Sequence, residues 1–163
     1  MEFEKIFKAK RISIISPSGS GKSTLAVKLG EILRLPVYHT DALEEQTGKV
    51  ADRNKWIIDG IRLSTLEKRI NRSNIVIYLN FPIDFCIAGV NSRHEQKEKR
   101  LGMPKTFSIS KEEFRLNCLN SLENWNNGRG EAIKILAQKY APKFVGFKSR
   151  EELESWLGKM LRQ

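Results

Sequence analysis

A short segment near the start of the chain constrains the fold more than any other part of the sequence. Residues 11–25 read RISIISPSGSGKSTL, in which an apolar, β-favouring run breaks into a Ser/Gly-rich loop and continues as a helix-forming stretch. Gly19 and Gly21 let the loop curl and bring several backbone N–H groups close to an anion. A strand, such a loop and a helix in this order predict a binding site for the phosphates of a nucleotide.

The residues of this loop have distinct expected roles in phosphate binding. Lys22 brings positive charge, the hydroxyl of Ser23 is an oxygen ligand of the kind that Mg²⁺ accepts, and the helix that opens there directs its partial positive charge at the anion. The usual pattern starts with a glycine, whereas this chain has Ser16, which we expect to restrict the first bend of the loop without abolishing the site. The alternative interpretation is a Gly/Ser-rich turn that happens to precede a lysine.

The length and composition of the chain predict one domain. With 163 residues, the chain is long enough for a sizeable core but short for two independent domains. No apolar run reaches the roughly 20 residues of a membrane span, and the charged first eleven residues do not resemble a signal peptide. Cys86 and Cys118 are too few and too far apart for a disulfide framework or a zinc site. We therefore expect a soluble cytoplasmic protein without a membrane partner.

The chain is strongly basic. Its net charge of +10, from 29 Lys and Arg against 19 Asp and Glu, favours anionic partners such as a nucleotide, an acidic substrate or nucleic acid. Groups of basic residues occur in separate stretches, at residues 5–11, 93–105 and 134–150, with neither an aromatic-interleaved RNA motif nor zinc-finger spacing. A solvated basic surface, a DNA-binding face and a middle stretch that handles phosphate all stay open as interpretations.

Short apolar runs alternate with amphipathic stretches along the whole chain, which predicts an α/β fold with a parallel sheet buried on both faces. The expected strands are 11–16, 36–39, 55–59, 74–80 and 143–147. The expected helices are 22–34, 63–71, 82–101, 111–126, 131–140 and 150–161, the last capped by Ser149 with Glu152 three residues on. Ligands of such a fold bind at the carboxyl edge of the sheet.

Two aspartates at the ends of predicted strands should project beside the phosphate loop. Asp41 follows the second strand and Asp59 ends the third. Carboxylates there hold Mg²⁺ through water or take a proton from an attacking hydroxyl. The alternatives are a helix N-cap for Asp41 and a turn or cap before Gly60 for Asp59. The neighbouring His39 reads as an ordinary hydrogen-bonding residue.

The motifs around these residues resemble those of the adenylate-kinase-like P-loop proteins known as DNA topology modulation proteins (FlaR-related). The resemblance covers most of the chain and rests on the runs STLAVKLGEIL, LPVYHTDAL, KWIIDG, STLEKRI, NIVIYLNFP and FKSREELESWL. It implies a P-loop NTPase fold with three α/β/α layers, in which a five-stranded parallel sheet of the nucleotide-kinase type has its third strand beside the first. It also implies binding of ATP with Mg²⁺ and, by analogy, phosphoryl transfer.

The resemblance assigns roles to individual positions of this chain. The residues that it places at the ATP phosphates are Ser18, Gly19, Ser20, Gly21, Lys22, Ser23 and Thr24. The implied metal residues are Ser23 and Asp59, and the implied acceptor residues are Asp41, Gly60 and Arg69. The implied catalytic residues are Lys22, Asp41, Asp59, Arg93 and Arg129. For Arg93 and Arg129, ordinary surface charges are the alternative interpretation.

The chain departs from the family pattern in the parts around the acceptor. The segment 42–53, which should cover the acceptor, is shorter than its family counterpart by about a helix, and a lid-like basic segment follows at 93–109. Ile61 and Arg62 stand where the family has Asn-Tyr, and Gly89 replaces an expected arginine. These departures concern catalysis more than nucleotide binding.

Three functions fit these expectations. The first is an ATP-binding kinase or NTPase that transfers a phosphoryl group to a small acceptor or to water. The second is a nucleotide-binding regulatory protein that acts on DNA topology through its basic surface without kinase turnover, and the third is a nucleotide binder without any turnover. The sequence leaves open the acceptor, the choice between ATP and GTP, and the oligomeric state.

Overall fold

A five-stranded parallel sheet forms the centre of the described part of the chain. The structure, a computed structural model, describes residues 3–95 and 110–163. Its strands are β1 (Arg11–Ile15), β2 (Val37–His39), β3 (Trp56–Asp59), β4 (Ile75–Leu79) and β5 (Phe144–Phe147), in the order β2-β3-β1-β4-β5. The third strand therefore pairs with the first, with Ile12 opposite Ile57, which confirms the sheet expected from the sequence.

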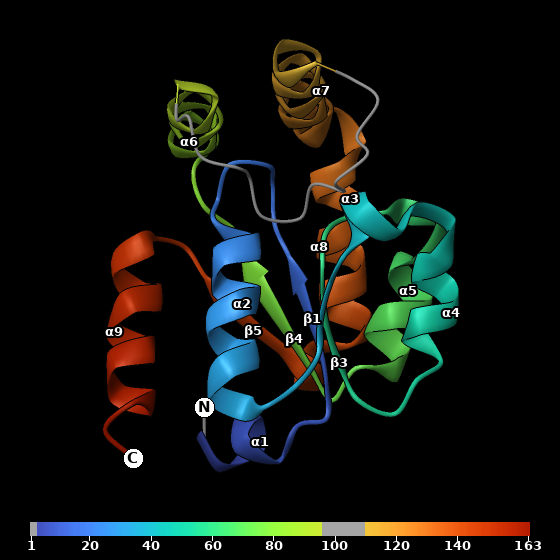
Figure 1. Cartoon of the computed structure of the whole chain (residues 1–163), viewed down its shortest axis with the longest axis vertical. Helices are drawn as coiled ribbons and strands as arrows, with labels where there is room; N and C mark the ends of the chain where they lie inside the picture. The colour runs from blue at the N-terminus through green and yellow to red at the C-terminus, as the bar shows by residue number, and fades with distance from the viewer. Residues whose placement is uncertain (1–2, 96–109) are drawn as a thin grey trace.

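Helices cover both faces of this sheet. The described helices are α1 (Phe3–Lys8), α2 (Lys22–Leu33), α3 (Thr40–Leu43), α4 (Thr47–Ala51), α5 (Leu63–Arg72), α6 (Ile83–Glu95), α7 (Lys111–Asn124), α8 (Gly130–Lys139) and α9 (Arg150–Met160), with 3₁₀ turns at Glu44–Gln46 and Ala141–Lys143 and a π-helical turn at Trp125–Arg129. Figure 1 shows α2 and α9 on one face, α4, α5 and α8 on the other, and α6 and α7 beyond the carboxyl ends of the strands. None of the described helices is both long enough and apolar enough to cross a membrane.

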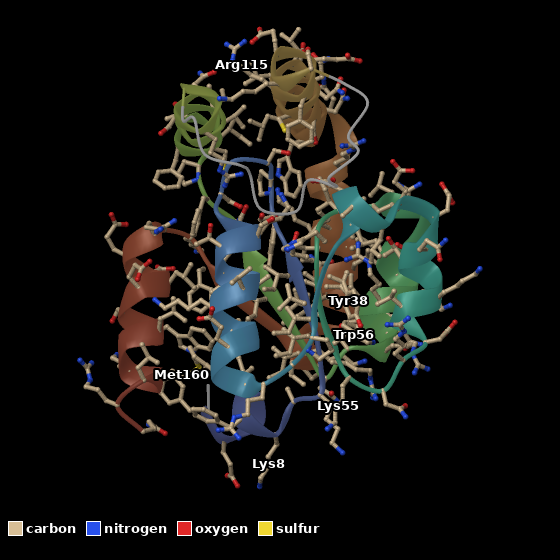
Figure 2. The ribbon with its side chains drawn as sticks, in the orientation of Figure 1. Lys8, Tyr38, Lys55, Trp56, Arg115 and Met160 are labelled. Atoms are coloured by element: carbon tan, nitrogen blue, oxygen red, sulfur yellow. The ribbon has the colours of Figure 1, made fainter. Side chains whose placement is uncertain are left out.

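The side chains of the central strands alternate between the two faces of the sheet, because successive residues of a strand point to opposite sides. On β4, Ile77 joins the core beneath α2 and α9, whereas Tyr78 joins the core beneath α5 and α8. Met160 of α9 and Trp56 of β3 mark these two sides in Figure 2. Because both faces are buried, the strands read as continuous apolar runs in the sequence.

The predicted elements are found with small differences at their ends. Each strand lies within one residue of its predicted bounds and each helix within two, except that the helix predicted over 82–101 is described only as far as Glu95. The predicted Ser149 cap is confirmed, since its hydroxyl accepts a hydrogen bond from the N–H of Glu152 at 3.2 Å. The short helix α1 is not among the predicted elements, although its Ile6 is fully buried in the core.

The segment 42–53, predicted to be a shortened cover over the acceptor, folds as a packed piece of its own. It holds the end of α3, a 3₁₀ turn and α4. Val50 and Ala51 of α4 pack against Trp56 and Ile58 of β3, and burial of this apolar surface attaches the segment to the sheet. A small hydrophobic cluster therefore fixes a segment whose composition is mostly polar.

Candidate functional site

The phosphate loop lies where β1 ends and α2 begins, at the carboxyl edge of the sheet. Gly19 and Gly21 adopt φ angles of +84° and +91°, a backbone conformation that residues with a side chain rarely adopt. Gly21 is also the N-cap of α2, and no side chain caps the helix there. The first N–H groups of α2 therefore have no side-chain acceptor, which leaves them available to a phosphate.

Helix α6 packs directly on the phosphate loop through two glycines. A Cβ atom at Gly19 would lie 2.0 Å from the carbonyl oxygen of Cys86, and a Cβ atom at Gly89 would lie 2.1 Å from the carbonyl oxygen of Gly19. Neither position has room for a side chain. An arginine at position 89 would push α6 off the loop.

Ser16 stands at the first bend of the loop without backbone strain. Its φ angle is not in the positive range, so this bend does not require the conformational freedom of glycine. The Ser16 hydroxyl instead bonds to the hydroxyl of Ser20 and to the carbonyl oxygen of Pro17, the latter at 3.0 Å. The serine thus makes contacts that a glycine at this position would lack.

A cavity of about 340 Å³ opens beside the phosphate loop. Its walls come from that loop, the start of α3, the connection between β3 and α5, helix α7 and the π-helical turn. Among the residues predicted for catalysis and acceptor binding, those that line it are Lys22, Asp41, Gly60 and Arg129. The predicted residues that do not line it are Asp59, Arg69 and Arg93.

Asp59 lies behind the cavity, where its two carboxylate oxygens have different partners. Oδ2 bonds to Nδ1 of His39, and Oδ1 accepts a hydrogen bond from the Ser23 hydroxyl at 3.3 Å. Only 2% of Asp59 is exposed, so its carboxylate is engaged inside the site and does not cap a turn at the surface. The hydrogen bond with Asp59 raises the pKa of His39 above its ordinary value, against the opposing effect of burial.

Ser23 and Asp59 together fit a Mg²⁺ ion. A hydroxyl oxygen and a carboxylate oxygen 3.3 Å apart are hard ligands of the kind that this ion prefers. The part of the chain that the structure describes contains no cluster of three or more His, Cys, Asp or Glu side chains suited to hold a metal. In proteins, Mg²⁺ commonly combines one or two carboxylates with water and substrate phosphates.

Asp41 occupies a different place from Asp59. It belongs to the first turn of α3, is exposed, and lines the cavity together with Lys22. The N-cap of α3 is His39, so the alternative interpretation of Asp41 as an N-cap is wrong. The structure thus separates the two predicted acids into one that faces the cavity and one that contacts Ser23 behind it.

Arg69 supports the site from beneath and has no exposed surface. Its two terminal nitrogens both donate to the carbonyl oxygen of Gly60, each at 3.1 Å. Burial lowers the pKa of the guanidinium to about 10, while the charge of Asp59 opposes this shift. A Cβ atom at Gly60 would lie 1.8 Å from Oγ1 of Thr40, so Arg69 holds a bend where the ends of β2 and β3 come very close.

Two arginines from separate parts of the chain line the cavity. Arg129 comes from the π-helical turn, where Gly128, with a φ of +140°, interrupts the helix. The Arg129 guanidinium donates to the Ser121 hydroxyl at 2.9 Å. Arg62 follows the bend after β3 and pairs with Glu45. Arg62 was not predicted as a cavity residue, although its place two residues after Gly60, at the end of a predicted strand, was an available signal.

Arg93 lies half-buried on α6. Burial raises the pKa of the Cys86 thiol to about 11, and the positive charges of Lys22 and Arg93 oppose this rise. The rest of the predicted basic lid, residues 96–109, lies outside the described residues. The structure therefore places only the first residues of that segment.

Helix α7 forms a wall of the cavity that the sequence did not predict. The residues that it contributes are Phe114, Asn117, Cys118 and Ser121. Their spacing of three, four and seven residues is that of one helix face, a pattern that does not tell a cavity wall from a core face. Arg115, near the top of Figure 2, donates to Asn91 of α6 at 3.0 Å, so the wall is tied to the helix that packs on the phosphate loop.

No protein-family model matches the sequence, and no curated protein matches it. Solved structures do resemble the chain. Shikimate kinase from Bacteroides thetaiotaomicron is 18% identical with a TM-score of 0.53, and the match covers 95% of this chain and 99% of that one.

Two further solved structures show the same likeness. Shikimate kinase from Acinetobacter baumannii, in complex with shikimate, is 14% identical with a TM-score of 0.54 over 99% of this chain and 98% of that one. An uncharacterized protein from Eubacterium ventriosum is 14% identical with a TM-score of 0.51 over 96% of this chain and 100% of that one. At these identities the likeness concerns the fold, and it confirms the three-layer P-loop NTPase fold with its five-stranded parallel sheet.

Proposed function

We propose that this chain is an ATP-dependent kinase that phosphorylates a small acceptor carrying both a hydroxyl and an anionic group. The observation that carries the proposal is that one cavity is lined by Lys22 of the phosphate loop and also by Asp41, Arg62 and Arg129. A donor phosphate on the loop and an acceptor in the cavity would then be neighbours. Positioning of this kind supplies much of the catalysis in phosphoryl transfer.

On the donor side, the chain offers fixed positive charge. Lys22 and the N-terminus of α2 would bind the β- and γ-phosphates of ATP. Ser23 and Asp59 would hold Mg²⁺, which when bound neutralises charge on the phosphate oxygens. His39 holds the other oxygen of Asp59, which keeps the carboxylate turned so that Oδ1 faces Ser23.

On the acceptor side, the cavity offers one carboxylate and two guanidinium groups. Asp41 would accept the proton of the acceptor hydroxyl. The hydroxyl oxygen would attack the γ-phosphorus as the bond to the leaving ADP breaks. Arg62 and Arg129 would pair with an anionic group of the acceptor or with the transferred phosphoryl group. The α7 wall, with the apolar Phe114, would limit access of water to the transferred group.

The experiment that tests this function is a screen for ADP release with ATP and Mg²⁺ over nucleosides, nucleotides, sugars and hydroxy acids. Shikimate, the ligand of the Acinetobacter kinase structure, belongs in this screen because it carries hydroxyls and a carboxylate. We expect turnover with an anionic acceptor and much less with its uncharged analogue. ATP binding without turnover on any acceptor would favour a nucleotide binder and contradict the kinase.

A regulatory protein that acts on DNA topology is the second proposal, in line with the family that the sequence resembles. A specific observation favours it. Three lysines, Lys5, Lys8 and Lys143, line a cavity of about 430 Å³ at the starts of β4 and β5, the edge of the sheet opposite the phosphate loop. Lys8 pairs with Glu4, and Lys143 donates to the carbonyl oxygen of Asn71 at 2.5 Å, so part of this charge is already engaged.

Salt dependence separates the two proposals. Binding to DNA phosphates releases counterions and weakens steeply as salt is added, by about a factor of 10³ or more between 50 and 200 mM for six or more contacts. ATP binding inside a loop of backbone N–H groups should change far less. If the protein does not bind duplex DNA even at low salt, the regulatory proposal is contradicted.

A further inference from the structure

Two buried serine hydroxyls bond to each other inside the phosphate loop. Ser16 is 0% exposed and Ser20 is 1% exposed, and their Oγ atoms form a hydrogen bond. Ser16 also donates to the carbonyl oxygen of Pro17 at 3.0 Å. Each hydroxyl can donate one proton and accept hydrogen bonds, so either serine can be the donor in the bond between the two side chains.

This bond closes the loop from the inside. It joins the end of β1 to the residue before Gly21, the N-cap of α2, and so spans the part of the loop that contains Gly19. A glycine at position 16, as in the usual pattern, has no side chain with which to make it. The chain thus has a hydrogen bond between side chains at the position where the usual pattern has a glycine.

A loop that is ordered before its ligand arrives loses less conformational entropy on binding. Ser18 to Lys22 must present several N–H groups to one phosphate at the same time, and Gly19 and Gly21 make this stretch intrinsically flexible. The bond between Ser16 and Ser20 restricts that flexibility without adding a group to the cavity, since neither residue lines it.

We propose that Ser16 is a positioning residue, which acts through Ser20 to hold the phosphate loop in its binding conformation before the nucleotide arrives. This inference rests on the proposed nucleotide site and deepens it. It replaces the view of Ser16 as a tolerated departure from the pattern.

The experiment is a double-mutant cycle in ATP affinity, measured by calorimetry with Mg²⁺ on the full chain. We expect Ser16→Ala and Ser20→Ala each to weaken ATP binding by about three- to tenfold, the range of one hydrogen bond. The double variant should lose no more than either single variant, because all three lack the same bond. Ser16→Gly should also weaken binding, although it restores the usual pattern.

A matched control exists on the same strand. Ser13 of β1 forms a buried hydroxyl-to-hydroxyl bond with Ser73 at 2.8 Å, away from the phosphate loop. Ser13→Ala should lower the free energy of unfolding and leave ATP affinity unchanged. In nucleotide-free protein, the amide resonances of Gly19 and Gly21 should broaden in Ser16→Ala and stay as in the wild type in Ser13→Ala. A merely structural role of Ser16 would not produce this difference.

The outcomes separate this inference from the kinase proposal. ATP affinity that is unchanged or tighter in Ser16→Ala and Ser16→Gly, or additive losses in the double variant, would overturn the inference. A single variant leaves one buried hydroxyl unpaired and can fail to fold for that reason. The double variant Ser16→Gly/Ser20→Ala removes both hydroxyls, and it must still bind ATP more weakly than the wild type. A wild type that binds ATP but phosphorylates no acceptor contradicts the kinase and leaves the inference standing.

Discussion

The carbonyl oxygen of Gly19 in the phosphate loop lies against Gly89 of α6, so closely that a Cβ atom at position 89 would come within 2.1 Å of it. We expect Gly89→Ala to lower the free energy of unfolding by about 1–3 kcal/mol and to weaken ATP binding, because the added methyl group pushes the helix and the loop apart. Urea unfolding and calorimetry measure the two effects.

Gly158→Ala is the matched control for this change. Gly158 lies in α9, and a Cβ atom there would meet Nη2 of Arg162 only at 3.9 Å. Alanine should therefore stabilise the fold by up to about 1 kcal/mol through its helix propensity and leave ATP affinity unchanged. If Gly89→Ala behaved like this control, α6 would not be held against the loop.

Lys22 should carry much of the affinity for nucleotide. We expect Lys22→Ala to reduce ATP affinity at least tenfold, about 1.4 kcal/mol, because a charged contact to phosphate is lost without a substitute. Lys28→Ala, on the same helix but outside the cavity lining, should bind ATP as the wild type does. Calorimetry with Mg²⁺ decides, and unchanged affinity in a folded Lys22→Ala variant would remove the phosphate-loop interpretation.

Replacement of Asp41 and of Asp59 by asparagine should reduce ATP hydrolysis to different extents. We expect slow Mg²⁺-dependent hydrolysis of ATP by the wild type without acceptor. Asp59→Asn should reduce this hydrolysis at least tenfold more than Asp41→Asn, because Asp59 contacts Ser23 at the proposed metal whereas Asp41 faces the acceptor cavity. Single-turnover hydrolysis, after ATP binding is verified for each variant, tests this division, and equal losses would refute it.

Arg62 and Glu45 form an ion pair, but replacing each of them should affect acceptor binding to a different extent. We expect Arg62→Gln to raise the KM for the anionic acceptor at least tenfold, because a charge-assisted contact inside the cavity is lost. The side chain of Glu45 is 88% exposed, and exposed ion pairs contribute little to stability or binding. Glu45→Gln should therefore change that KM less than about twofold. Steady-state kinetics with the acceptor found in the screen measure both, and a matching rise in both variants would place Arg62 outside acceptor binding.

The phosphate loop was predictable from the sequence because its signal is local. The strand, the loop and the helix of residues 11–25 are consecutive, and the two loop glycines with a positive φ, Gly19 and Gly21, stand within that run. The five strands were equally accessible, since burial on both faces leaves continuous apolar runs. The conformation at Ser16 was not predictable, because a residue type alone does not fix its φ angle.

The remainder of the site depends on which elements meet in space. The bond between His39 and Asp59 joins residues on β2 and β3 that pair only because these strands are neighbours. The contribution of α7 depends on a helix that returns over the carboxyl edge of the sheet (Figure 1). Its stripe of cavity residues reads in the sequence like any buried helix face, so periodicity alone does not distinguish a core from a cavity wall.

The contact between His39 and Asp59 should make the stability of the fold depend on pH. The pKa of His39 is raised by its hydrogen bond with Asp59, so it lies above the unfolded value of about 6.5. The contribution of the pair is fully present below that value and is lost as the pH rises through the folded-state pKa. Urea unfolding in buffer without divalent cations, between about pH 6 and 8, should show a free energy of unfolding that falls more steeply in the wild type than in His39→Asn. Asparagine keeps a hydrogen bond to Asp59 but does not titrate, so parallel slopes in the two proteins would show that the charge on His39 contributes nothing to the fold.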